Sequence, residues 1–201
     1  MIIAFDLNGV FFNNGTALAA RMIAAHFGLD QKTLAFVLKG EFAKPYRTGK
    51  IEPALYWEKV REFLQLSLYQ TQMFRSLLFE AYYPIDEVIE IAEHLRGSGF
   101  VTAYLSNMPK DKALYLQNQF AFMNYFDYGL CSYETGVLKP SKAFFREFMA
   151  RFAVEPRHVA YIDDGRRNVE AARALGMTAF MFETAQQLRA DLFAADLLEQ
   201  K

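Results

Sequence analysis

The stretch Ile2-Ile3-Ala4-Phe5-Asp6-Leu7-Asn8-Gly9-Val10 decides the fold class of this chain. Its first four residues are apolar, as is typical of a buried strand, and Asp6 ends that run. The pair Asn8-Gly9 follows at once and indicates a turn. Open α/β sheets bind ligands at the carboxyl ends of their strands, so we expect Asp6 to face a ligand crevice.

Three further polar clusters stand at or near the ends of later apolar runs. Parallel strands bring their carboxyl ends to one edge of a sheet, so residues far apart in sequence are expected to meet there. The clusters are Ser106-Asn107 after residues 101–105, Lys139 within residues 136–140, and Asp163-Asp164 after residues 159–162.

The pattern of apolar residues changes at Pro84. Before it, helical spacing predicts helices over Ala17–Phe27, Lys32–Lys39, Pro53–Leu66 and Gln70–Tyr82. After it, strands predicted at 100–105, 128–132, 159–162 and 178–182 alternate with helices at 86–96, 110–119, 141–152, 166–175 and 185–198. This alternation predicts an α/β fold, a Rossmann-like three-layer sandwich with a parallel sheet and an inserted helical segment.

Composition limits the function classes. With 201 residues and 53% apolar residues, the chain has room for one domain with an insertion and a sizeable core. Its 22 basic and 23 acidic residues give a net charge of -1, and no basic run suggests nucleic-acid binding. The lone Cys131, the lack of a charged leader and the lack of a membrane-length apolar stretch predict a cytoplasmic protein that spans no membrane.

The polar clusters suit phosphoryl transfer. An aspartate such as Asp6 can accept a phosphoryl group and so divide one hard displacement into two easier ones. Magnesium prefers carboxylate oxygens, which Asp6 and Asp163 or Asp164 would supply. Lys139 and the Ser106 hydroxyl would stabilise the charged phosphoryl oxygens, with backbone N–H groups after Asp6.

The sequence resembles the haloacid dehalogenase superfamily. Its four motifs match, in order, Phe5-Asp6-Leu7-Asn8-Gly9-Val10, Leu105-Ser106-Asn107, Lys139-Pro140 and Ile162-Asp163-Asp164. The resemblance implies a core domain over residues 1–15 and 85–201 and a helical cap domain over 16–84. The stretch Tyr46-Arg47-Thr48-Gly49-Lys50-Ile51 resembles the cap of sugar-phosphate phosphatases and of the phosphatase domain attached to soluble epoxide hydrolases.

The resemblance also implies roles for single residues. Asp6 is the expected nucleophile, with Asn8 and Lys139 as the other catalytic positions. Mg²⁺ is expected on Asp6, the backbone carbonyl of Asn8 and Asp164, with Asp163 as an auxiliary ligand or as a partner of the ligands. The expected phosphate-binding residues are Leu7, Asn8, Ser106, Asn107 and Lys139.

Asn8 departs from the phosphatase pattern, which has aspartate there as general acid and base. An amide can neither protonate a leaving group nor activate water. Positioned acid–base catalysis is worth roughly 10²- to 10⁴-fold, so slow turnover is compatible with asparagine. Four explanations stay open: natural loss of activity, a deliberate substitution, takeover by another group, and a shift to halide displacement.

Three functions therefore compete. The first is magnesium-dependent hydrolysis of a small phosphorylated metabolite, weakened by Asn8. The second is a metal-free 2-haloacid dehalogenase, which Asn8 favours but the adjacent carboxylates Asp163 and Asp164 oppose, since they would repel an unneutralised substrate carboxylate. The third is a catalytically silent phosphate-binding protein. Arg47 is a candidate to hold a second anionic or hydroxyl-rich group of the substrate.

Overall fold

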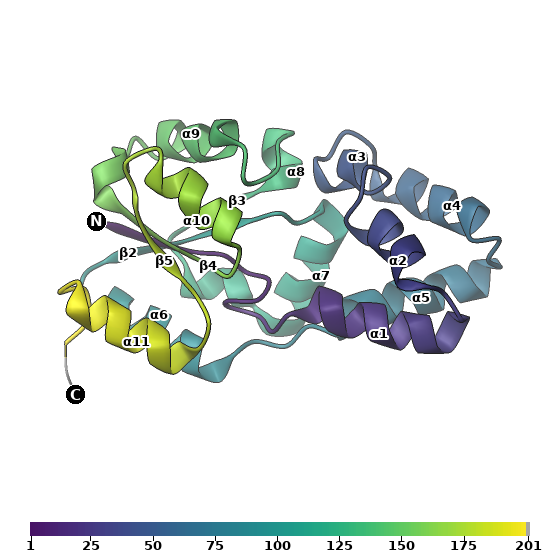
Figure 1. The fold of residues 1–201 in the computed structure, drawn as a ribbon, viewed down its shortest axis with the longest axis horizontal. Helices are drawn as coiled ribbons and strands as arrows, with labels where there is room; N and C mark the ends of the chain where they lie inside the picture. The colour runs from purple at the N-terminus through teal and green to yellow at the C-terminus, as the bar shows by residue number, and fades with distance from the viewer. Residues whose placement is uncertain (200–201) are drawn as a thin grey trace.

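The computed structural model describes residues 1–199 and is built on a five-stranded parallel sheet (Figure 1). The spatial order is β3-β2-β1-β4-β5, so the first strand lies in the centre. The chain fills one side of β1 and then crosses to the other, and this reversal opens a crevice at the carboxyl ends of the strands. The strands are β1 (Ile2–Phe5), β2 (Val101–Ser106), β3 (Tyr128–Cys131), β4 (Val159–Asp163) and β5 (Thr178–Met181).

Helices cover both faces of the sheet. Phe5 and Ile162 point to one face and pack with α6 (Asp86–Gly97), α7 (Lys110–Phe120) and α11 (Ala185–Ala194). Ala4 and Tyr161 point to the other and pack with α9 (Lys142–Arg151) and α10 (Arg166–Arg173). The predicted three-layer α/β fold is confirmed. Three short helices connect these elements: η1 (Phe122–Tyr125), α8 (Ser132–Thr135) and η2 (Pro156–His158).

Six helices lie between β1 and β2 in the sequence, and the five that precede α6 form a separate group. In Figure 1 these five lie beyond the carboxyl ends of the strands. Their apolar side chains, among them Ile23, Val60 and Phe74, form a hydrophobic cluster of their own. The helices are α1 (Gly15–Phe27), α2 (Gln31–Leu38), α3 (Lys44–Arg47), α4 (Pro53–Phe63) and α5 (Leu68–Glu80).

The predicted elements differ from the observed ones mainly in their ends and in four short helices. Helix α3 occupies part of a segment that periodicity predicts as a connection, and η1, α8 and η2 were not predicted. Three or four residues are too few to show a helical period, which explains these omissions. Within the described residues, no helix has the length and apolar character needed to cross a bilayer.

Candidate active site

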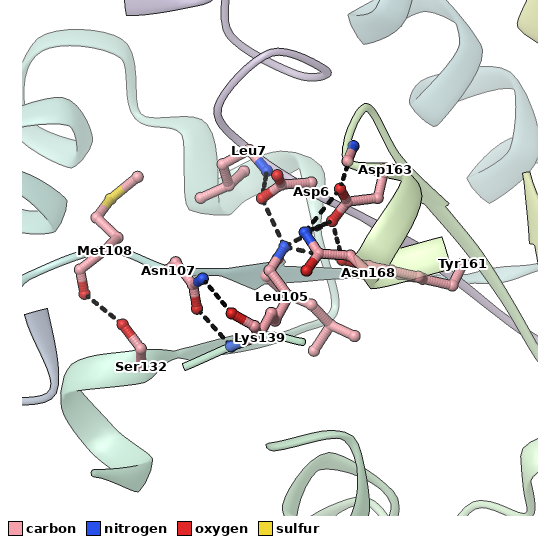
Figure 2. Close-up of polar contacts among 11 residues, drawn as sticks. Asp6, Leu7, Leu105, Asn107, Met108, Ser132, Lys139, Tyr161, Asp163 and Asn168 are labelled. Carbon is pink, nitrogen blue, oxygen red and sulfur yellow. Dashed lines mark hydrogen bonds and ion pairs between the residues drawn. The ribbon is translucent and has the colours of Figure 1, made fainter. Parts of the chain in front are cut away.

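The crevice at the centre of the sheet brings the separated polar clusters together (Figure 2). Asp6 follows β1, Ser106 ends β2 and Asp163 ends β4, and all three are buried. Lys139 reaches the same place from the loop before α9, and its Nζ lies 2.9 Å from Asp6 Oδ1 and 2.9 Å from Asp163 Oδ2. The strand-end argument therefore correctly predicts which segments meet.

Lys139 is held in one orientation by its neighbours. Its Nζ also donates to the Leu105 carbonyl at 2.7 Å and to the Tyr161 hydroxyl at 2.8 Å. Burial alone would lower the pKa of Lys139, but the carboxylates of Asp163 and Asp6 raise it above its usual value. The ammonium therefore stays charged beside Asp6 at neutral pH.

Asp163 is occupied by protein donors. Its carboxylate accepts from Lys139, from Asn168 Nδ2 at 2.9 and 3.1 Å, from the Gly165 N–H at 2.7 Å and from the Tyr161 hydroxyl. Burial opposes ionisation, yet the charge of Lys139 and these hydrogen bonds lower the pKa of Asp163. This side chain is suited to holding Lys139 and the loop after β4 in place.

Asp6 and Asp164 offer the oxygens that a cation would need. Ligand oxygens of Asp6, Asp163 and Asp164 lie within 4.8 Å of one another, and the buried Lys139 forms ion pairs with Asp6 and Asp163. Burial raises the pKa of Asp6 to about 7, and Asp163 and Asp164 add to this while Lys139 opposes it. Excess negative charge on clustered carboxylate oxygens fits a divalent cation such as Mg²⁺.

Gly9 makes the approach of Asp164 possible. It has a φ of +92°, and a Cβ built there would lie 2.2 Å from Asp164 Oδ2. Only glycine combines this backbone conformation with the space that the carboxylate occupies.

Asn8 faces the cavity with its amide group partly engaged. Its Oδ1 accepts a hydrogen bond from Thr16 Oγ1 at 3.3 Å, and Thr16 in turn contacts the Tyr82 hydroxyl. The amide NH₂ group of Asn8 thus remains available as a donor. It has no proton that it can transfer at neutral pH.

Asn107 and Leu7 have internal partners. Asn107 binds the backbone of Lys139 from both ends of its amide, donating to the carbonyl at 2.9 Å and accepting from the N–H at 2.8 Å. The Leu7 N–H donates to Asp6 Oδ1 at 2.7 Å. Their contacts with phosphate stay predictions, and a positioning role is visible for both.

The cavity above Asp6 has a volume of about 240 Å³, and residues of helices α1 to α5 line the side opposite the sheet. From that side, Thr16, Lys39, Tyr46, Arg47 and Tyr56 line it, with Lys112 entering from α7. Sequence reasoning identified Arg47 but missed Lys112, Thr16 and Tyr161. For Lys112, the available signal was its position in the first turn of the helix that follows Ser106, which points back to the crevice.

The sequence of this chain is also similar to those of known hydrolases. Residues 1–176 match the haloacid dehalogenase-like hydrolase family. A phosphoglycolate phosphatase of Mannheimia succiniciproducens is 27% identical over 191 residues, covering 89% of this chain and 83% of the relative. The chain belongs to the haloacid dehalogenase-like hydrolases.

Solved structures share the fold. A haloacid dehalogenase family enzyme of Bacteroides thetaiotaomicron, solved as a variant with magnesium and inorganic phosphate, has a TM-score of 0.75 at 19% identity and covers 90% of this chain and 93% of its own. An L-2-haloacid dehalogenase has a TM-score of 0.65 at 18% identity, covering 90% and 83%. Both phosphate-binding and dehalogenase members therefore share this architecture.

Proposed function

We propose that this chain is a magnesium-dependent hydrolase of small phosphate monoesters that uses Asp6 as its nucleophile. The observation that carries the proposal is the buried Asp6 carboxylate, 2.9 Å from Lys139 and grouped with Asp163 and Asp164. An unpaired substrate carboxylate would be repelled by this group, whereas a phosphoryl group with its metal would neutralise it. The phosphatase relative supports the same reaction class.

Asp6, the backbone carbonyl of Asn8 and the side chain of Asp164 would hold Mg²⁺. The ion would supply positive charge for the phosphoryl oxygens and for the carboxylates around them. Asp163 is better suited to hold Lys139, because four donor groups already surround it.

The first half-reaction is a displacement at phosphorus. A carboxylate oxygen of Asp6 bonds to the phosphorus, the bond from phosphorus to the ester oxygen breaks, and the leaving oxygen takes a proton from solvent. Lys139 and the Ser106 hydroxyl stabilise the phosphoryl oxygens as charge shifts among them. In the second half, a water oxygen bonds to the phosphorus, the bond from phosphorus to the Asp6 oxygen breaks, and the proton of the water passes to solvent, which releases phosphate and restores the carboxylate.

Asn8 affects the two halves unequally. An aryl oxygen with a low pKa leaves without protonation, so Asp6 can still be phosphorylated. Hydrolysis of the phosphorylated aspartate needs a base to activate water, which the amide cannot provide. Slow turnover after a fast first step is the expected kinetic behaviour.

We further propose that residues 16–84 form a cap domain on the core of residues 1–15 and 85–201. The cap lines the cavity opposite Asp6 and would exclude water from the phosphorylated aspartate. A cavity of about 240 Å³ favours a small metabolite as the substrate.

The test is a comparison of the unaltered chain with Asn8→Asp and Asp6→Asn on an aryl phosphate in magnesium. The unaltered chain should give an initial burst and slow turnover, and Asn8→Asp should raise the steady rate by roughly 10²- to 10⁴-fold. Asp6→Asn should abolish both. The proposal fails if Asn8→Asp is inactive on a broad set of phosphate esters.

A metal-free 2-haloacid dehalogenase is the second candidate, and Asn8 is the observation in its favour. Halide release from a 2-haloacid by the unaltered chain in the presence of a chelator would establish it in place of the phosphatase. Phosphate binding without turnover in either assay would establish the silent phosphate-binding protein.

A further inference from the structure

Lys112 is a buried lysine in the cavity that forms no ion pair with an acidic residue among residues 1–199. It lies in the first turn of α7, its side chain is buried, and it lines the same cavity as Asp6. Among residues 1–199, no carboxylate lies within ion-pair distance of its Nζ. Its Nζ instead lies 3.7 Å from the centre of the Tyr82 ring. A cation–π contact offsets only part of the cost of burying an ammonium group.

The position of Lys112 relates it to the leaving group. The ammonium group of Lys112 lies over the Tyr82 ring, and the Tyr82 hydroxyl is hydrogen-bonded to the Thr16 hydroxyl. Thr16 Oγ1 in turn donates a hydrogen bond to Asn8 Oδ1. Asn8 stands where the family has its acid for the leaving oxygen. Lys112 is therefore connected to the leaving-group side of the cavity through this chain of contacts. Lys139, by contrast, is paired with Asp6, beside which the phosphoryl group would bind.

Arg47 adds a second cation from the cap. Its side chain is half-buried, lines the cavity and donates from Nη1 to the Lys39 carbonyl at 3.3 Å. Burial lowers the pKa of Lys112 to about 7, and the next largest influence is the positive charge of Arg47. Two basic side chains from different elements thus line one cavity, and their charges repel each other unless an anion lies between them.

We propose that Lys112 and Arg47 bind a second anionic group on the leaving part of the substrate. The preferred substrates are then short phosphate monoesters that carry a carboxylate or a second phosphate a few bonds from the ester oxygen. This inference rests on the proposed phosphatase function and names its substrate class. A charge-assisted contact of this kind is worth about tenfold or more in affinity.

The test uses phosphonates, which bind without turnover, and calorimetry on the unaltered chain in magnesium. Phosphonopropionate carries a terminal carboxylate, propylene diphosphonate a second phosphonate, and propylphosphonate neither. The unaltered chain should bind one of the first two at least about tenfold more tightly than propylphosphonate. The tighter of the two identifies the second anionic group.

Lys112→Met should remove this preference and change the affinity for propylphosphonate less than about twofold. Arg47→Ala should reduce the preference in the same way, and it provides a second variant because its side chain is less buried. Lys110→Met is the matched control, since Lys110 is exposed on the same helix and does not line the cavity. It should retain the preference.

Two results would overturn the inference and leave the phosphatase proposal standing. One is equal binding of all three phosphonates by the unaltered chain. The other is an equal loss of affinity for all three in Lys112→Met, which would assign the charge of Lys112 to the phosphoryl group itself. If no phosphonate binds and Asn8→Asp hydrolyses no ester, both proposals are wrong.

Discussion

At the scale of single residues, Gly9 shows how backbone conformation would control the proposed cation site. A methyl group there would meet Asp164 Oδ2 at 2.2 Å at a φ of +92°. We expect Gly9→Ala to weaken magnesium binding at least about tenfold and to destabilise the fold by about 1–3 kcal/mol, because both the strain and the clash must be relieved.

Gly28→Ala is the matched control for this prediction. Gly28 also has a positive φ of +65°, but a Cβ there has no atom within 4 Å. It should destabilise the fold by about 1 kcal/mol and leave magnesium affinity unchanged. Calorimetry and thermal unfolding separate the two effects, and equal magnesium affinity in both variants would refute the role of Gly9.

Lys112 gives a pH-dependent prediction for stability. Burial and the charge of Arg47 lower its pKa from 10.5 to about 7 in the folded protein. Between these values the unfolded chain binds a proton at this side chain that the folded chain does not, so this residue makes stability rise with pH across that range. Below about pH 7, Lys112 is charged in the folded protein as well, so the full free-energy cost of burying its ammonium group opposes folding.

Lys112→Met should therefore stabilise the protein relative to the unaltered chain, more at about pH 7 than at about pH 10. Urea unfolding at the two pH values measures the difference, with Lys110→Met as the exposed control. A stability difference that does not change with pH would show that the pKa of Lys112 is not lowered.

The sequence predicts the residues of the site better than their contacts. Asp6, Ser106 and Asp163 are recognisable because each directly follows an apolar run that predicts a strand, and the carboxyl ends of parallel strands meet at one edge of a sheet. The pairing of Asn107 with the backbone of Lys139 depends on a loop geometry that no periodicity encodes. Lys112 was overlooked because a lysine on an amphipathic helix usually lies in solvent.

At the scale of elements, Asp111 joins the helices of the proposed cap to α7. Its carboxylate accepts from the Tyr46 hydroxyl at 2.5 Å and from Trp57 Nε1 at 2.9 Å, and it lies 3.4 Å from Arg75 Nη2. The three donors come from α3, α4 and α5, so a single carboxylate contacts three cap helices. Burial and the negative charge of Asp111 raise the pKa of Tyr46 far above its usual range, so its hydroxyl remains a donor.

We expect Asp111→Ala to loosen the cap, because it leaves the Tyr46 hydroxyl and the Trp57 indole without their partner. The loss should be about 2–4 kcal/mol of stability. Trp57 is the single tryptophan of the chain, so its fluorescence reports on this contact directly, and its emission should shift to longer wavelength.

Glu87→Ala is the control for that measurement, since Glu87 is an exposed carboxylate on α6. It should change neither the emission nor the stability by more than about 0.5 kcal/mol. An unchanged emission spectrum in Asp111→Ala would show that the cap keeps its position without this carboxylate. The sequence did not predict Asp111 in this role, since its partners lie 36 to 65 residues away along the chain.

At the scale of the whole molecule, the chain enters and leaves the proposed cap, residues 16–84, at two neighbouring points, and Asn13 connects these points by hydrogen bonds. Its Nδ2 donates to the Ala81 carbonyl at 2.9 Å and its Oδ1 accepts from the Tyr83 N–H at 3.0 Å. Its own N–H donates to the Tyr83 carbonyl at 3.0 Å. Gly15 stands beside them, where a Cβ would lie 2.5 Å from the Tyr82 ring. The turn at Asn13-Asn14-Gly15 is evident from the sequence, but its pairing with residues 81–83 is not, because it depends on the return of the chain after five helices.

Asn13 therefore provides a test of whether residues 16–84 move as a unit. Asn13→Ala removes the two side-chain hydrogen bonds, each worth about 0.5–1.5 kcal/mol. If these two points are the hinge, amide hydrogen exchange should accelerate throughout α1 to α5 and stay unchanged in α9 and α10. Asn14→Ala is the neighbouring control. Its Oδ1 accepts from the Ala17 N–H within α1, at 3.2 Å, so exchange should increase in the first turn of that helix alone. Equal acceleration in cap and core would show that the molecule opens as one cooperative unit, and the cap could then gate the cavity only by way of global unfolding.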